Sequence, residues 1–303
     1  RDVAVTGVQT CALPILLLVD ENAEPGGQLL WAEAAIDGRP ALQWVEAAMA
    51  ALCAMPAVRV LARATAFGHH DHNFVAILER CSDHLQPGQR APHLPRERVW
   101  KVRAREVVVA AGSFERPLMF ANNDLPGVML ASAAAGYAYR HAVRAGDTAV
   151  VVAGNDSAYQ AAATLQRAGV RLAAIVDLRP APPAAAGELA ALVVPGAAVV
   201  AARGARAVRE VLVAPLGVDG SALAGPVRRI ACDLVCVAGG WTPAVHLFSQ
   251  SGGTLRFDAA LQCFVPDAAR PGVRVAGACN GEFGLAGYLA QGRSEEHTSE
   301  IQS

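Results

Sequence analysis

The sequence predicts an α/β protein made of two nested dinucleotide-binding domains of the Rossmann-like, FAD/NAD(P)-binding kind. Three features predict this fold: an apolar run that ends in two acids at 16–21, a second apolar run that ends in glycine at 107–112, and a strand–turn–helix–strand pattern over 148–176. Short, uninterrupted apolar runs are typical of parallel strands that are buried on both faces. Their alternation with helices is typical of βαβ units.

The composition is that of a globular protein. The chain has 303 residues, of which 53% are hydrophobic and 17% charged, and its formal net charge is −1. This length is enough for two domains with a large core. No basic run with interleaved aromatic residues predicts a nucleic-acid partner, and no apolar stretch is long enough to predict a membrane span. Apart from Cys11, the cysteines form neither CxxC pairs nor a secreted disulfide framework, which favours a reducing, cytoplasmic environment.

The two ends of the chain resemble translated sequencing-adapter DNA. A DNA that encodes residues 5–15 can be read on its complementary strand, in another frame, as R-S-E-E-H-T-S-E-L-Q-S. Residues 293–303 match this peptide except at Ile301. One adapter at both ends of a DNA fragment predicts such a match, whereas the alternative is a pair of unusual natural tails. We therefore expect 1–15 and 293–303 to be foreign segments and exclude them from the fold.

Periodicity and turn residues predict the elements of the first domain in chain order. A buried strand is expected at Leu16–Val19, followed by a helix over Pro40–Met55 with one apolar face. Two paired strands, a polar loop and a second buried strand follow, at Val58–Thr65, Phe74–Leu78, Ser82–Pro95 and Val107–Ala111.

A second α/β unit begins after Gly146. It has a strand over Thr148–Ala153, a helix that ends before Gly169 and a strand over Leu172–Val176. Further strands are expected at Ala198–Ala202, Val208–Val213, Ile230–Val237 and Val273–Ala276, before a final helix. The predicted division is a first, discontinuous NAD-binding domain over 16–118 and 232–292, and an inserted second Rossmann-like domain over 119–231.

Asp20 and Glu21 are the main candidates for a binding role. In a Rossmann fold an acid at the end of the second strand accepts the hydroxyls of an adenosine ribose and repels a 2′-phosphate. This pattern favours NAD or FAD over NADP, although an ordinary acid that caps a turn fits equally well. Gly26 and Gly27 allow close approach of the backbone to a ligand, and Gln28 offers a hydrogen bond. The glycine fingerprint that should precede the acids is absent from the sequence.

The turn of the second unit departs from the phosphate-binding pattern. It reads Gly154-Asn155-Asp156-Ser157, and Asp156 stands where the second glycine is wanted. A carboxylate there would oppose phosphates, so we expect this turn to keep the fold without the usual nucleotide.

No catalytic or metal-binding set is expected. Neighbouring residues of a hairpin point to opposite faces, so His69, His70, Asp71 and His72 are predicted to form a solvated turn rather than a metal site. No nucleophile–base pair and no pair of catalytic carboxylates is evident.

Two uncommon strings resemble a known family. Residues 107–132 read VVVAAGSFERPLMFANNDLPGVMLAS, and residues 238–253 read AGGWTPAVHLFSQSGG. Both are similar to segments of the alpha subunits of heterotetrameric sarcosine oxidases, and the similarity extends over Leu16–Gly292. The resemblance implies nested domains of the glutathione-reductase type, truncated at the N-terminus, and a further C-terminal domain that would bind tetrahydrofolate.

The resemblance also implies an activity and its cofactors. Sarcosine would be oxidised to glycine at FAD on the beta subunit, with electrons passing to FMN at the alpha–beta interface and on to oxygen. Hydrogen peroxide would form, and the one-carbon unit would pass to tetrahydrofolate. The alpha subunit would bind NAD, and its partners would be the beta, gamma and delta subunits. The isolated fragment is expected to be inactive.

Family members bind NAD at positions that match residues of this chain. The matching positions are Asp20, Glu21, Asn22, Gln28, Ala66, Ala278, Phe283 and Leu285. With Gly26, Gly27 and Gly277 they form the predicted cofactor site. Related flavoproteins carry Gly-Asp where this chain has Gly277-Ala278, and alanine cannot bind a flavin ribityl chain, so NAD fits better than FAD. The alternatives are a subunit of a related opine or amine dehydrogenase, a non-catalytic nucleotide-binding scaffold, and a defective reading frame.

Overall fold

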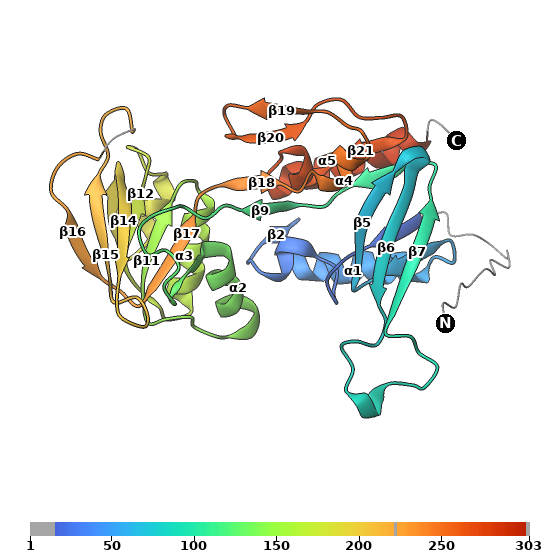
Figure 1. Ribbon diagram of the computed structural model, residues 1–303, viewed down its shortest axis with the longest axis horizontal. Coiled ribbons are helices and arrows are strands. Elements are labelled where there is room, and N and C mark those ends of the chain that lie inside the picture. The colour runs from blue at the N-terminus through green and yellow to red at the C-terminus, as the bar shows by residue number, and fades with distance from the viewer. Residues whose placement is uncertain (1–15, 221–222, 301–303) are drawn as a thin grey trace.

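The computed structural model describes residues 16–220 and 223–300. Figure 1 shows two halves, each with strands and helices, joined by the extended strands β9 (Ser113–Glu115) and β18 (Trp241–Pro243). The predicted foreign segment 1–15 lies outside the described residues, and so do 301–303. Residues 293–300 continue the helix α5 (Leu285–Glu300). None of the helices in the described part of the chain is long and apolar enough to cross a membrane.

The second module (residues 116–238) is built around a five-stranded parallel sheet. Its strand order is β10-β17-β11-β12-β13. The strands are β10 Val128–Leu130, β11 Thr148–Ala153, β12 Arg171–Asp177, β13 Leu192–Pro195 and β17 Leu234–Ala238. One face is covered by helices α2 (Ala131–His141) and α3 (Ser157–Arg167), and the other by the antiparallel strands β14 (Ala197–Arg203), β15 (Glu210–Pro215) and β16 (Arg228–Ala231). The 3-10 turn η4 (Ala184–Glu188) precedes β13.

Strand β11 shows why this sheet is buried on both faces. Ala149 and Val151 pack in the cluster beneath α2 and α3, whereas Val150 and Val152 pack against β14 and β15. All four are at most 1% exposed. The βαβ unit predicted over 148–176 is therefore confirmed, and its apolar run is a parallel strand with both faces covered.

The boundary predicted at residue 232 lies elsewhere in the structure. The predicted boundary places strand β17 in the first domain, but β17 pairs in parallel with β10 and β11 in the second sheet. The chain leaves the second module only after Ala238, through Gly239 and Gly240 into β18. An apolar run fits either sheet, and its long-range pairing decides which sheet it joins.

The first module (residues 16–112 and 244–300) contains two separate pairs of parallel strands. Strand β1 (Leu16–Val19) pairs with β4 (Val58–Leu61), and β8 (Val107–Val109) pairs with β21 (Val273–Val275). An antiparallel sheet of β5 (Ala64–His70), β6 (Phe74–Arg80) and β7 (Glu97–Arg103) packs against them. The remaining elements are η1 Gly27–Leu30, β2 Ala35–Ile36, β3 Arg39–Pro40, α1 Ala41–Ala54, η2 Asp71–Asn73, η3 Pro87–Gln89, α4 His246–Gln250, β19 Leu255–Asp258, β20 Cys263–Pro266 and η5 Gly277–Asn280.

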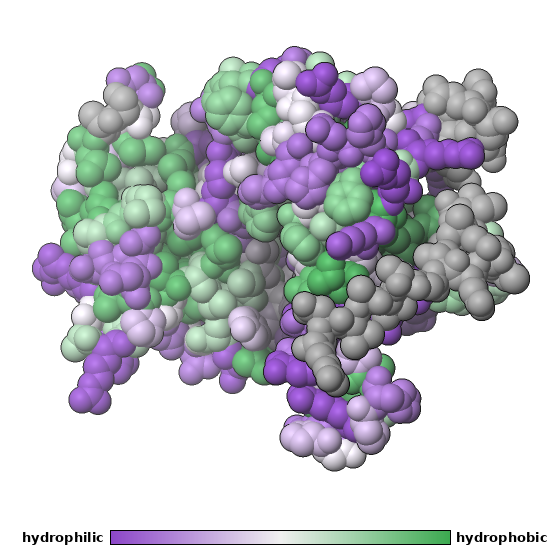
Figure 2. All heavy atoms as spheres, turned by 45° about the vertical axis from the view of Figure 1, so that its right-hand side comes forward, coloured by the Kyte–Doolittle hydropathy of each residue, from purple (hydrophilic) through white to green (hydrophobic). Residues whose placement is uncertain are grey.

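Two predictions in this module have different outcomes. The strand predicted over 58–65 is broken at Arg63, which has a positive φ of 55°, so that β4 joins the parallel pair and β5 starts a hairpin. The polar loop predicted over 82–95 is confirmed, because it contains only turns and η3. It projects from the lower end of the module in Figure 1, and the same projection is mainly hydrophilic in Figure 2.

Candidate nucleotide site

The acids that follow β1 differ in what their carboxylates contact. The Asp20 N–H donates to the Leu61 carbonyl at 2.9 Å, which extends the parallel pair by one residue. Asp20 Oδ1 accepts hydrogen bonds from the backbone N–H of Asn22 at 2.8 Å and from its Nδ2 at 3.1 Å, so this carboxylate closes an Asx turn. Glu21 is exposed, and its carboxylate makes no hydrogen bond or ion pair with another described residue. Glu21 is therefore the acid that can meet a ligand.

The backbone around Glu21 is held in place by two arginines. Arg80 Nη2 donates to the Glu21 carbonyl at 2.8 Å, and the Arg63 N–H donates to the Asn22 carbonyl at 2.8 Å. These bonds fix the main chain and leave the Glu21 side chain free to turn toward a ligand. The Glu21 carboxylate can therefore accept hydrogen bonds from a ligand.

The predicted glycine turn lies at the start of η1. Gly26 has a φ of 144°, and a Cβ there would come within 3.1 Å of the Leu30 side chain. Gly27 has a φ of 53°, and no atom lies within 4 Å of where its Cβ would be. Gln28 is exposed. The φ of Gly26 requires glycine, and Gly27 presents an open surface to the cavity that Glu21 also lines.

The opposite wall comes from the C-terminal part of the chain. Strand β21 leads into η5, and the Gly277 N–H donates to Gln291 Oε1 of α5 at 2.8 Å. Ala278, Phe283 and Leu285 are partly exposed, whereas Cys279 is fully buried in a core cluster. Cys279 is thus a packing residue.

All the predicted cofactor-site residues line one cavity. Its volume is about 4370 Å³, and it reaches from β1 and β8 to the helices of the second module. The members are Asp20, Glu21, Asn22, Gly26, Gly27, Gln28, Ala66, Gly277, Ala278, Phe283 and Leu285. Segments far apart in sequence therefore meet around one space of ample size for a dinucleotide.

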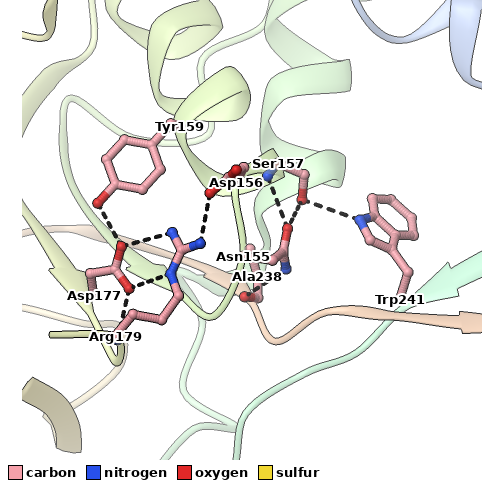
Figure 3. A network of polar contacts seen from close by, with 8 residues as sticks. All are labelled: Asn155, Asp156, Ser157, Tyr159, Asp177, Arg179, Ala238 and Trp241. Carbon is pink, nitrogen blue, oxygen red and sulfur yellow. Dashed lines mark hydrogen bonds and ion pairs between the residues drawn. The ribbon is translucent and has the colours of Figure 1, made fainter. Parts of the chain in front are cut away.

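The turn after β11 is filled by its own side chains. Asn155 Oδ1 accepts the Ser157 N–H at 2.9 Å and the Ser157 hydroxyl at 2.6 Å, and Trp241 Nε1 donates to Ser157 Oγ at 3.2 Å. Figure 3 shows these contacts at the start of α3. The sequence singled out Asp156, but Asn155 is the residue that occupies a backbone N–H of the helix N-terminus. The signal was available, because an Asn side chain commonly accepts the backbone N–H two residues on in such a turn.

The acid at the end of β12 is also engaged. Tyr159 donates to Asp177 Oδ2 at 2.7 Å, and Arg179 donates to both carboxylate oxygens at 2.9 and 3.0 Å. Arg179 also pairs with Asp156 at 2.7 Å. Burial alone would raise the pKa of Asp177, but the hydrogen bonds from Arg179 and Tyr159 outweigh it and hold the pKa below its ordinary value. This carboxylate is fully buried and has no surface for a ribose.

The prediction of a solvated turn is wrong for His69. His70, Asp71 and His72 are exposed, but His69 is 1% exposed, and neither ring nitrogen has a hydrogen-bond partner among the described residues. The pairing of β5 with β6 shifts between Ala66 and Gly68, and such a bulge turns the next residue inward. No group of three or more His, Cys, Asp or Glu residues in the described ranges is arranged to hold a metal ion.

The chain is similar in sequence to sarcosine oxidase alpha subunits, which confirms the resemblance of its two strings. It is 41% identical over 283 residues to "Sarcosine oxidase subunit alpha" of Corynebacterium sp. (strain P-1). It is 38% identical over 285 residues to the protein of that name from Rhizobium meliloti (strain 1021). Each alignment covers 91% of this chain but only 29% and 27% of those relatives, so the chain spans less than a third of their length. No protein-family model matches the chain.

Solved structures confirm the predicted fold class. The L-proline dehydrogenase from P. horikoshii matches 87% of this chain and 45% of its own length, with a TM-score of 0.62 and 20% identity. The thioredoxin reductase from T. acidophilum matches 91% of this chain and 92% of its own length, with a TM-score of 0.62 and 14% identity. At such low identity these matches define the architecture alone.

Proposed function

Because the chain is homologous over 91% of its length to sarcosine oxidase alpha subunits, we propose that its first module binds NAD as part of such a subunit. The observation that carries the proposal is the Glu21 carboxylate, which is exposed, unengaged by the described residues and part of the same cavity lining as the glycine turn. A carboxylate in this position accepts the hydroxyls of an adenosine ribose. The same charge repels the 2′-phosphate of NADP.

The far wall of the cavity supports NAD rather than a flavin in this module. Ala278 follows Gly277, and it has no carboxylate that could accept hydrogen bonds from a ribityl chain. In the proposed binding mode Glu21 holds the ribose, Gln28 donates from η1, and the backbone near Gly277 approaches the ligand closely. NAD, when bound, supplies a nicotinamide ring capable of hydride exchange. No residue of the chain is assigned a catalytic role.

In the proposed complex the oxidative chemistry takes place outside this chain. Sarcosine is oxidised at FAD on a beta subunit, and FMN at the alpha–beta interface transfers the electrons. The one-carbon unit passes to tetrahydrofolate on a further domain of the alpha subunit. Gamma and delta subunits complete the proposed assembly, and the cysteine pattern favours a cytoplasmic location.

Calorimetric titration of the chain with NAD and with NADP tests the proposal. We expect NAD to bind at one site, NADP to bind more weakly, and Glu21→Gln to weaken NAD binding about tenfold. The change replaces a charged hydrogen bond of roughly 1.5–3 kcal/mol by a neutral one of roughly 0.5–1.5 kcal/mol. Asp37→Asn is the matched control, because Asp37 is an exposed acid of the same module that does not line the cavity. Equal NAD affinity in the Glu21 variant and the wild type would contradict the proposed site.

The activity of the whole complex needs a separate measurement. Oxygen uptake with sarcosine is expected only after a beta subunit is added to an alpha subunit of full length. Uptake by this chain alone would show that catalysis has been assigned to the wrong subunit.

A further inference from the structure

The segment that carries the glycine turn is anchored on both modules. Leu30 is buried beside Gly26 and Val45, within the first module. The next residue, Trp31, turns the other way and lies on α2 of the second module. Its ring occupies the space above Gly136, where a Cβ would come within 2.8 Å of Trp31 Cε3.

One arginine of α2 holds both ends of this segment. The Arg140 guanidinium lies 4.8 Å from the centroid of the Trp31 ring, and Arg140 Nη2 pairs with Glu24 Oε2 at 3.0 Å. The His141 ring meets Trp31 edge-on at 5.6 Å. Glu24 precedes Gly26 and Gly27, and Trp31 follows them, so the turn is bracketed by two contacts to the same side chain.

The Trp31 contact is the stronger part of this anchor. Arg167 and Glu33 form a second ion pair between the modules at 2.9 Å, but both side chains are more than half exposed. Such pairs contribute little, because water and salt screen them. Trp31 instead places an aromatic face against a buried glycine and under a guanidinium, a contact that depends on close packing.

We propose that Trp31 is a positioning residue for the nucleotide site, which holds Gly26–Gln28 in its binding conformation by docking on α2. This inference rests on the proposed function and extends it, since packing of Trp31 on the second module would then set the nucleotide affinity of the first. A loop that is already ordered loses less conformational entropy when a ligand binds. Releasing Trp31 from α2 is therefore expected to weaken binding. Trp31 also lines the cavity whereas Gly136 does not, so a change at Gly136 releases the ring without removing a cavity-lining side chain.

Gly136→Ala is the sharpest variant for a test. Alanine favours the helix more than glycine does, so α2 itself is not weakened, yet its Cβ displaces the Trp31 ring. We expect Gly136→Ala and Trp31→Ala each to weaken NAD binding about fivefold, the effect of ordering roughly one more residue on binding. The double variant is expected to be no weaker than either single variant. Trp31→Phe, which keeps an aromatic face on α2, is expected to stay within about twofold of the wild type.

Two further measurements separate positioning from a loss of structure. Hydrogen exchange without nucleotide is expected to rise over residues 23–31 in Gly136→Ala and to stay unchanged in β11. Trp44→Ala removes an exposed tryptophan of α1 outside the cavity and is expected to leave NAD affinity unchanged.

The outcomes distinguish this inference from the proposed function. If the wild type binds NAD and both Gly136→Ala and Trp31→Ala bind it equally well, the positioning role is overturned while the site stands. If the wild type binds no NAD, the proposed function fails and the positioning role fails with it. If Trp31→Phe is as weak as Trp31→Ala, the aromatic contact with α2 is not the cause.

Discussion

The parallel strands of the two modules differ in how fully they are enclosed. In the second module β11 lies between β12 and β17, and residues such as Val151 and Leu234 are 0% exposed. In the first module the strands form two separate pairs, and Leu16 of β1 and Val108 of β8 are 47% and 48% exposed. Apolar runs of the same kind are thus buried only where a neighbouring strand and a covering layer are present on each side.

The two modules also differ in whether the polar side chains at their strand ends have partners within the protein. In the second module Asp177 is buried and bonded to Tyr159 and Arg179, and Asn155 closes the turn before α3. In the first module Glu21 is exposed and unengaged by the described residues. In the second module the carboxyl ends of the strands are therefore filled by the module's own side chains, whereas in the first module the Glu21 carboxylate is open to a ligand. We therefore expect substitution of the acids in the second module to lower the stability of the protein, and substitution of Glu21 in the first module to weaken NAD binding.

The largest effect on stability is expected from Asp177→Ala. This change removes the acceptor for both Tyr159 and Arg179, and breaking such a buried network costs about 3 kcal/mol. Chemical denaturation should show this loss in the free energy of unfolding, with NAD affinity unchanged in the folded protein. Asp156→Ala is the control, because the Asp156 side chain is 68% exposed and its ion pair with Arg179 contributes at most about 1 kcal/mol.

The pH dependence of the same contact has a definite sign. The pKa of Asp177 is lower in the folded protein than in the unfolded chain, so its stabilising effect is present above the ordinary aspartate pKa of about 3.9 and is lost as pH falls through the folded value. The difference between the wild type and Asp177→Ala should hold from pH 7 to about pH 5 and shrink below about pH 4. A difference that shrinks on going from pH 5 to pH 7 would contradict this assignment.

A medium effect on stability is expected at Asn155. Asn155→Ala leaves the Ser157 N–H without its acceptor, which should cost about 1 kcal/mol of stability. Gln28→Ala is the matching change in the first module, and it should leave stability unchanged while weakening NAD binding about threefold. If Asn155→Ala instead weakened NAD binding and Gln28→Ala did not, the nucleotide would bind at the strand ends of the second module and not of the first.

The smallest effect is expected at Glu115, a buried acid on the strand between the modules. Burial raises the pKa of Glu115, against the opposing effect of its hydrogen bond from the Ser132 N–H. Its ionised form is therefore disfavoured in the folded protein, and Glu115→Gln should stabilise the chain by roughly 0.5–1 kcal/mol at pH 7. The gain should shrink as pH falls toward the ordinary glutamate value of about 4.3, because the folded wild type takes up its proton first. A gain that grows on acidification would contradict the raised pKa.

Much of the fold follows from local patterns in the sequence. The strand at Thr148–Ala153 and the helix over 41–54 were predictable with their burial, because apolar runs and one-sided apolar faces usually reflect burial. The strand at Leu16–Val19 was predicted in the right place, but the prediction that it is buried is wrong, because Leu16 is exposed and the other three residues are only partly buried. Helix α2 was missed because its alanines and Gly136 give no stripe of large apolar residues. The sheet that β17 joins, and the inward turn of His69 at a bulge, depend on long-range pairing that no local pattern records.

The candidate site was predictable only in part. An acid after a strand and a pair of glycines are visible in the sequence, and this led to Glu21 and Gly26. The choice between Asp20 and Glu21 depends on which carboxylate closes the turn with Asn22, and that needs coordinates. Trp31 was missed because its contact partners, Gly136 and Arg140, lie more than a hundred residues further along the chain.

Hydrogen exchange of the chain with and without NAD tests the central claim most directly, because one experiment reports on the strand ends of both modules. The account predicts that NAD slows exchange over residues 19–28 and 276–285 and leaves residues 153–159 and 177–179 unchanged. Protection over 153–159 without protection over 19–28 would contradict the proposed site, since the nucleotide would then bind at the strand ends of the second module, where Asn155 and Arg179 lie.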